Sequence, residues 1–282
     1  DVVINEIANV DKNKPFSMWV AFHAIHSAIV SRDDLYAKYR ERTTLDNRHE
    51  NFKYAALTEQ LDQTVGRILA ALDDPNGDGD QSDSMRDNTV VIFLSDNGGV
   101  HGGNHSNAPL KWAKGTLYEG GIRVPMMVRY PNLIKNSGVS AEPVHVIDFL
   151  PTFLDFAGVK YTHKEHKLDG ESIVPLLAGK AKQLDRDAIC WHFPGYMDER
   201  GIPASVINKR VDGKRYKYRY CYEYDTHELY NLTDDMGETV NLLEGNVTKS
   251  NLKIGNDLLK DLRKWIDSTQ PLPMYYVDNG KQ

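Results

Sequence analysis

The most constraining feature of the sequence is an unbroken apolar run from Val90 to Leu94, which stops at Ser95 and is followed at once by Asp96 and Asn97. A short run rich in β-branched and aromatic residues predicts a fully buried strand of a mostly parallel sheet. In open α/β sheets ligands bind beyond the carboxyl ends of the strands, so we expect the two polar side chains to face a site. Carboxylate and amide oxygens suit a hard cation such as Ca²⁺ or Mg²⁺.

The loop after this strand is rich in glycine and polar residues and carries His101, His105, Lys111 and Lys114. A second apolar run, residues 122–130, returns to the sheet. Two ammonium groups near a metal-binding strand end predict a site for a small tetrahedral anion. A surface loop with ordinary lysines and exposed histidines is the alternative on these residues alone.

The bulk composition is that of a globular protein. Hydrophobic residues make up 40% of the 282 residues and charged residues 26%, and the formal net charge is −6. An acidic chain without a basic block argues against a nucleic-acid partner, and no apolar run is long enough to span a membrane. Cys190 and Cys221 form neither a disulfide framework nor a metal-binding spacing, so one bridge or two buried thiols are both open.

Periodicity predicts the remaining elements. Apolar residues at helical spacing predict helices over residues 1–12, 47–72, 144–157 and 252–266, and a short, strongly charged helix capped by Asp33 or Ser31 is expected over residues 33–42. Residues 16–23 are expected to form another buried strand. From about residue 185, short alternating segments predict a small antiparallel sheet with tyrosines on one face.

Residues 73–84, DDPNGDGDQSDS, are similar to a calcium-binding loop at their first positions. An EF-hand requires a bidentate glutamate at the twelfth position, and counted from Asp74 that position is Met85. We therefore expect a solvated turn, with a weak calcium site that stiffens the turn as the alternative.

Several longer motifs together resemble one known family. Residues 95–99 read SDNGG and residues 107–125 NAPLKWAKGTLYEGGIRVP, preceded by KPFSMWVAFHAIHS and followed by VHVIDFLPTFLDFAG, LDGESIVPLLAG and HELYNLTDDMGETVNLLE. This series is similar in content and order to the type I sulfatases of the alkaline-phosphatase-like superfamily. The resemblance implies a three-layer α/β sandwich with a mixed, mostly parallel central sheet, incomplete here, over residues 1–180. A small α+β subdomain with an antiparallel sheet and a closing helix is expected over residues 181–282.

The resemblance also implies roles for individual residues. Asp96 and Asn97 would bind the Ca²⁺ ion that type I sulfatases use, and Lys114 and His26 would contact the sulfate and the leaving group. The family usually has proline soon after this histidine, whereas Ala28 stands here. Such a change affects the loop without removing the imidazole.

The expected substrate-binding residues are Lys111, His105 and His192. Lys111 is expected beside Lys114, and His192 lies where the family places part of the substrate cleft. His105 could line the pocket, although an ordinary exposed histidine is the simpler interpretation. Asp148 is expected to be a helix cap or a structural acceptor.

The nucleophile of the family is a formylglycine made from the first residue of a C/S-x-P/A-x-R motif, and the 282 residues contain no such motif. We therefore expect a central and carboxy-terminal portion of a sulfatase, inactive by itself, with the amino-terminal portion supplied as another segment or chain. The expected substrate is a sulfated sugar or another sulfate ester, in the periplasm, in lysosomes or outside the cell. The alternatives are a phosphate or phosphonate ester hydrolase of the same superfamily and a non-catalytic, sulfatase-like module that binds glycans.

Overall fold

The computed structural model describes residues 1–42, 51–102, 106–163, 165–197 and 201–269. The chain divides into two compact units. Residues 1–93 and 127–138 form the first, and residues 94–102, 106–126 and those from 139 onward form the second. This division does not coincide with the expected domain boundary at residue 180, which stays a prediction.

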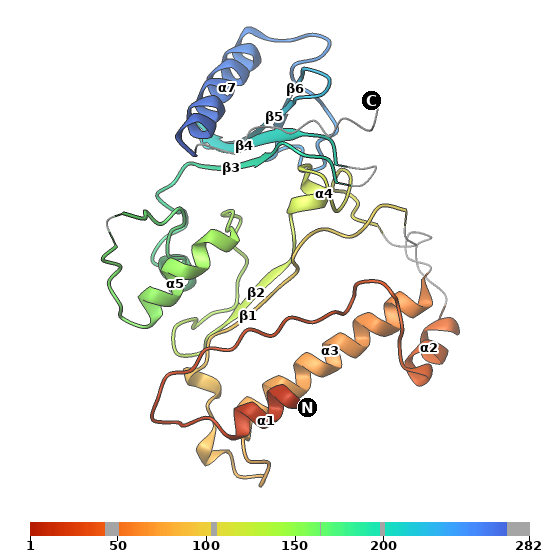
Figure 1. Cartoon of the computed structure of the whole chain (residues 1–282), viewed down its shortest axis with the longest axis vertical. Coiled ribbons are helices and arrows are strands. Elements are labelled where there is room, and N and C mark those ends of the chain that lie inside the picture. The colour runs from red at the N-terminus through yellow and green to blue at the C-terminus, as the bar shows by residue number, and fades with distance from the viewer. Residues whose placement is uncertain (43–50, 103–105, 164, 198–200, 270–282) are drawn as a thin grey trace, which may run out of the picture. The chain divides into compact units, whose positions relative to one another are not determined.

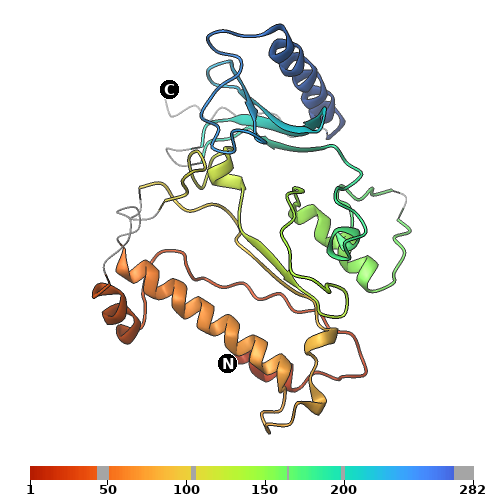
Figure 2. The same ribbon diagram turned by 180° about the vertical axis from the view of Figure 1, so that it is seen from behind.

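Three helices make up most of the first unit: α1 (Val2–Ala8), α2 (Asp33–Arg40) and α3 (Phe52–Asp73). They confirm the helices expected at the start of the chain. Both α1 and α2 pack against α3, and the two views of the ribbon show α1 lying along the carboxy-terminal half of α3 (Figures 1 and 2).

Local chemistry and packing both fix α3. Its first turn is capped by Asn51, whose side chain accepts a hydrogen bond of 3.0 Å from the backbone N–H of Tyr54. Its last turn buries Ala71 and Leu72 against Ile7 of α1. The periodic apolar stripe of the sequence therefore becomes the core of this unit.

The strand expected at residues 16–23 does not form. This segment has no regular secondary structure, and Phe16, Met18, Trp19 and Phe22 are all exposed, Trp19 by 76%. A strand requires a neighbour to satisfy its backbone groups, and no described strand pairs with this segment. The prediction of a buried strand is wrong for the structure of this chain.

The apolar run of residues 90–94 forms β1 (Val91–Leu94), which pairs with β2 (Met126–Arg129). Every residue of β1 is half-buried. The expectation of a fully buried strand is therefore not met, because the described residues give β1 a single partner strand.

The acidic segment after α3 is a turn closed on itself. The carboxylate of Asp74 accepts hydrogen bonds from the backbone N–H groups of Gly77 and Gly79, at 2.8 and 2.9 Å. Across the described parts of the chain, no group of three or more His, Cys, Asp and Glu residues is arranged to hold a metal ion. The hydrogen bonds confirm the expected turn.

The second unit contains a four-stranded antiparallel sheet in the order β3-β4-β5-β6. The strands are β3 (Ala188–Phe193), β4 (Ala204–Val211), β5 (Lys214–Cys221) and β6 (Thr226–Asn231). They confirm the predicted small antiparallel sheet. Cys190 and Cys221 are free thiols.

One face of this sheet is covered by α7 (Lys249–Thr269), as both ribbon views show (Figures 1 and 2). The core between them contains Ile207, Tyr218, Leu229, Leu258 and Leu262, each at most 2% exposed. Since side chains alternate along a strand, the neighbours of these strand residues point to the other face.

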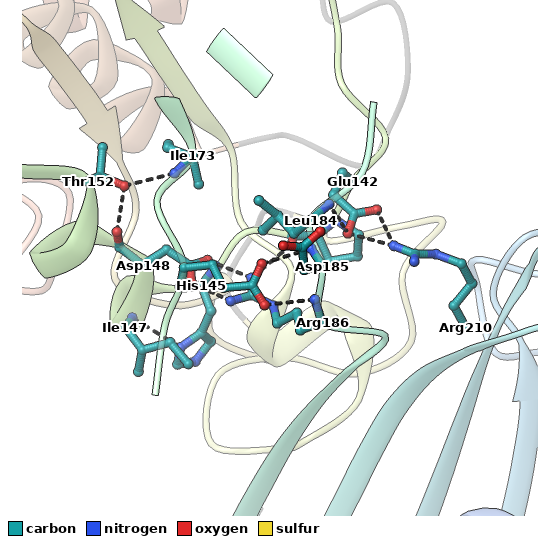
Figure 3. A network of polar contacts seen from close by, with 12 residues as sticks. Glu142, His145, Ile147, Asp148, Thr152, Ile173, Leu184, Asp185, Arg186 and Arg210 are labelled. Atoms are coloured by element: carbon teal, nitrogen blue, oxygen red, sulfur yellow. Dashed lines mark hydrogen bonds and ion pairs between the residues drawn. The ribbon is translucent and has the colours of Figure 1, made fainter. Parts of the chain in front are cut away.

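Helices α5 (Phe149–Phe156) and α6 (Val174–Leu177) lie in the segment before the sheet. Asp148, fully buried at the start of α5, accepts bonds from the backbone N–H groups of His145 and Glu171 at 2.8 and 3.0 Å (Figure 3). Arg186 binds both of its carboxylate oxygens. The expectation that Asp148 is a structural acceptor is confirmed.

No helix in the part of the chain that the structure describes is both long and apolar enough to cross a membrane.

Candidate functional site

The end of β1 presents two oxygen-bearing side chains. Asp96 is exposed, and its carboxylate has no partner among the described residues. Asn97 is half-buried and uses its amide N–H to donate to the Gly98 carbonyl at 3.0 Å, which leaves the amide oxygen available. The hydroxyl of Ser95 donates to the Asn97 carbonyl at 2.9 Å and so fixes the turn.

The backbone of the loop that carries Lys114 is bound directly to this turn. The N–H of Lys114 donates to the Gly99 carbonyl at 3.0 Å, and the N–H of Gly98 donates to the Gly121 carbonyl at 3.0 Å. Asn107 adds two further bonds, to the N–H and carbonyl of Gly99 at 3.0 and 2.9 Å. The structure therefore brings Lys114 into the same local framework as Asp96 and Asn97.

Two glycines allow this close contact. A β-carbon on Gly98 would lie 1.7 Å from the Gly120 carbonyl oxygen, and one on Gly120 would lie 2.2 Å from the Trp112 carbonyl oxygen. Both glycines are buried. The GG pairs of the sequence are needed because the backbones touch.

Lys114 and Lys111 have different surroundings. The half-buried Lys114 has an ammonium group with no hydrogen bond or ion pair to any described residue. The ammonium of Lys111 lies over the rings of Tyr118 and Tyr230, at 4.6 and 4.9 Å from their centroids, and donates to the Tyr230 hydroxyl at 2.9 Å. All three donors of Lys114 are thus available to an anion, whereas the ammonium of Lys111 already contacts two aromatic rings and a hydroxyl.

His26 belongs to the first unit and is exposed. Its Nδ1 lies 2.9 Å from the Ser27 carbonyl oxygen, and its ring packs edge-on to His23 with centroids 5.6 Å apart. A carbonyl oxygen only accepts, so Nδ1 donates and Nε2 is left for another contact.

His192 lies on the face of the sheet that α7 covers. Its Nδ1 is 2.6 Å from the hydroxyl of Ser205 and 3.2 Å from that of Tyr222. Burial lowers the pKa of this imidazole. Tyr230, which contacts Lys111, is next to the core residue Leu229 and therefore belongs to the opposite face. The structure places these two expected substrate-binding residues on different faces.

The remaining expected histidine, His105, lies outside the described residues. His101 is exposed, with its ring centroid 5.5 Å from that of Trp112. The roles assigned to all these side chains stay predictions.

Periodicity missed a buried charged cluster next to the loop. Lys217 of β5, with a fully buried side chain, lies 3.0 Å from Glu119 and 2.8 Å from Glu238. Glu119 begins α4 (Glu119–Ile122), and its backbone N–H donates to Glu238 at 2.7 Å. The available signal was the alternation of charged residues with tyrosines in RYKYRY, residues 215–220, whose charged face would ordinarily be assigned to solvent.

Comparison with known proteins identifies the group to which the chain is related. The sulfatase family model matches residues 1–159, and the model described as N-sulphoglucosamine sulphohydrolase, C-terminal, matches residues 110–267. The chain belongs to the sulfatase family. It is 46% identical to a sulfatase of Formosa agariphila over 271 residues, which cover 94% of this chain and 49% of that protein. It is also 33% identical to mouse arylsulfatase J over 168 residues, covering 59% of the chain and 26% of the relative.

Solved sulfatase structures confirm the fold class. The structure of Ps i-CgsB in complex with k-i-k-neocarrahexaose matches with a TM-score of 0.74 and 27% identity, covering 98% of this chain and 56% of that one. A structure in complex with D-glucosamine-2-N,6-O-disulfate, described as its substrate, matches with a TM-score of 0.61 and 26% identity, covering 78% and 41%. The chain thus spans about half the length of these relatives, as a central and carboxy-terminal part.

Sulfatases as a family generally bind a metal ion. The chemistry of Asp96 and Asn97 fits a hard cation, because both offer oxygen atoms without a donor in the described structure. Ca²⁺ takes about six to eight oxygen ligands, so two side chains would supply only a part of its coordination.

Proposed function

We propose that this chain is the part of a sulfuric ester hydrolase that binds the sulfate group, and that the substrate is a sulfated sugar or polysaccharide. The observation that carries the proposal is the position of Lys114. Its half-buried ammonium has no partner in the described structure, and its backbone is bonded to the turn that holds Asp96 and Asn97.

The chemistry assigns a separate task to each group. Lys114 binds an oxygen of the sulfate and offsets its negative charge without rearrangement during the reaction. Asp96 and Asn97 would supply oxygen ligands to a Ca²⁺ ion, which would supply positive charge to neutralise and position the sulfate. His26, in its doubly protonated imidazolium form, gives the Nε2 proton to the departing alcohol oxygen while its Nδ1–H stays bonded to the Ser27 carbonyl.

Attack on sulfur also requires a nucleophile. In the family this is a formylglycine, and the 282 residues hold no sequence from which it is made. The proposed hydrolysis therefore belongs to an assembly in which this chain acts with a nucleophile-bearing segment. Two related structures, one with k-i-k-neocarrahexaose and one with D-glucosamine-2-N,6-O-disulfate, support a sugar as the alcohol part of the ester. We expect such a protein in the periplasm, in a lysosome or outside the cell.

Titration of the 282-residue chain with inorganic sulfate in the presence of Ca²⁺, followed by calorimetry, tests the sulfate site. Lys114→Ala should weaken sulfate binding about tenfold to a hundredfold, because a hydrogen bond from a charged donor is worth roughly 1.5–3 kcal/mol. Lys182→Ala, which changes an exposed lysine, is the matched control and should leave the affinity unchanged.

Two results would contradict the assignment. Tighter binding of inorganic phosphate than of sulfate would favour a phosphate-ester hydrolase. Binding of a sulfated oligosaccharide with equal affinity in Lys114→Ala would favour a non-catalytic module that contacts the sugar elsewhere.

A further inference from the structure

We infer that Lys217 is a positioning residue for the sulfate site: together with Glu238 it holds Glu119, and through α4 it fixes the backbone of Lys114 beside the turn of Asp96 and Asn97. The role toward sulfate rests on the proposed function. The mechanical role rests on contacts within the second unit alone.

The first step is the burial of charge. Lys217 and Glu238 are at most 1% exposed and Glu119 is 4% exposed, so water cannot replace the contacts among them. Lys217 donates a hydrogen bond to Glu119, and its 2.8 Å contact with Glu238 is an ion pair without hydrogen-bond geometry. Removing one member of such a group leaves an uncompensated buried charge, which is far more costly than losing an exposed ion pair.

The second step is the attachment of α4. Groups from outside α4 hold Glu119 through its carboxylate, by Lys217, and through its backbone N–H, by Glu238, while Arg123 adds a 3.4 Å contact to the carboxylate. Because the side chain and the main chain are both fixed, the first turn of α4 has a defined position on the sheet. Burial raises the pKa of Glu238, while the Lys217 ammonium and the Glu119 N–H act in the opposite direction.

The third step leads from α4 to the candidate site. The residue after Glu119 is Gly120, whose N–H donates to the Lys111 carbonyl at 2.8 Å. The next residue, Gly121, accepts from the N–H of Gly98 at 3.0 Å. The backbone on both sides of the candidate site is therefore bonded to the α4 segment that Lys217 holds.

A second set of contacts on the same face of the sheet also holds the loop in place. The guanidinium of Arg219 lies 4.6 Å from the ring centroid of Tyr118 and 3.2 Å from Glu228, and the Tyr118 hydroxyl donates to Glu228 at 2.8 Å. Tyr118 immediately precedes α4 and also contacts Lys111. The charged face of β5 thus binds the loop at two consecutive residues.

Amide hydrogen exchange of the 282-residue chain tests the mechanical role directly. In Lys217→Met we expect the N–H groups of Lys114, Gly98 and Gly120 to exchange at least about tenfold faster, while the amides of β4 and β5 stay protected. The matched control is Lys209→Met. Lys209 pairs with Asp261 at 2.7 Å on the face that α7 covers, and its loss should leave the three loop amides unchanged.

Equal acceleration of all amides in Lys217→Met would show a general loss of stability and overturn the inference. Unchanged exchange of the Lys114 amide in a folded Lys217→Met variant would also overturn the inference. If Lys217→Met does not fold, Glu119→Gln takes its place, because it keeps the side-chain volume and removes the charge that Lys217 balances. It should accelerate the same three amides selectively, and a lack of such an effect overturns the inference as well.

The consequence for sulfate is measured separately, by calorimetry on the same variants. Lys217→Met should weaken sulfate binding about tenfold, and Lys209→Met should not. Faster loop exchange without weaker sulfate binding would leave the mechanical role standing and contradict the sulfate role. The two measurements thereby distinguish failure of the proposed sulfate site from failure of the positioning role of Lys217.

Discussion

Lys111 and Lys114 show how neighbouring residues of one type acquire different properties. Both were expected near an anion, on the basis of charge and spacing in a polar loop. In the structure Lys111 is enclosed by Tyr118 and Tyr230, which come from the loop and from β6. Lys114, in contrast, makes no hydrogen bond or ion pair to a described residue through its ammonium group. The partner ring of Tyr230 is more than a hundred residues away in sequence, so periodicity could not separate the two lysines.

His145 should make stability dependent on pH. Burial lowers its pKa, and its Nδ1 accepts from the N–H of Ile147 at 3.3 Å, so the native imidazole is neutral. In the unfolded state the pKa of histidine is about 6.5, so below that pH the unfolded chain binds more protons than the native one. The contribution of His145 to the free energy of unfolding should therefore be complete above about pH 6.5 and decrease as the pH is lowered below that value.

Urea unfolding at pH 7 and pH 5 measures this effect. His145→Gln should reduce the difference between the two midpoints, whereas His163→Gln, at an exposed position, should not. Burial also lowers the pKa of His192, so part of the pH dependence should persist in His145→Gln. Equal pH dependence in wild type and His145→Gln would exclude His145 as a contributing group.

The helices and the small sheet were largely predictable, because each carries its own periodicity. Residues 33–42 and 252–266 were expected as helices, and α2 and α7 lie there. The four short strands were expected from alternation and turn residues. The helix α4 was not predicted, since four residues containing two glycines have no helical pattern. It exists because Glu119, Gly120 and Gly121 are held by distant groups.

Gly120→Ala should disrupt the candidate site. Its β-carbon would lie 2.2 Å from the Trp112 oxygen and 2.4 Å from the Lys111 oxygen, which forces the two backbone segments apart. Overpacking of this kind costs about 1–3 kcal/mol and often more where backbone must move. Urea unfolding should show that loss, and sulfate binding should weaken. Gly138→Ala is the control, because no atom lies within 4 Å of its β-carbon. Unchanged stability in Gly120→Ala would mean that the loop can relax without cost.

At the scale of the whole molecule, the apolar segment of residues 16–22 differs most from expectation. Its side chains would suit a buried strand, yet Trp19 is 76% exposed and no described strand pairs with the segment. Exposed apolar side chains on an unpaired extended segment favour association with other chains. The chain spans about half the length of the Formosa agariphila sulfatase and of the Ps i-CgsB structure that it matches.

The isolated chain should therefore associate through this segment. We expect light scattering of the 282-residue chain to show oligomers that increase with concentration. The double variant Trp19→Lys and Phe22→Lys should reduce them without lowering the unfolding midpoint, because neither side chain is part of a buried core. Val2→Lys, at another exposed apolar position, should have little effect. Equal association in the double variant would place the contact elsewhere on the chain.

The sequence by itself determined the elements with strong local patterns and the family. It also determined the juxtaposition of Asp96, Asn97 and Lys114, because a strand end, glycine pairs and a lysine-bearing loop lie within twenty residues of one another. Tertiary structure alone decided that the charged face of β5 is buried rather than solvated. Lys217, Glu119 and Glu238 meet across more than a hundred residues, and a local pattern contains no information about which segment will cover a sheet face.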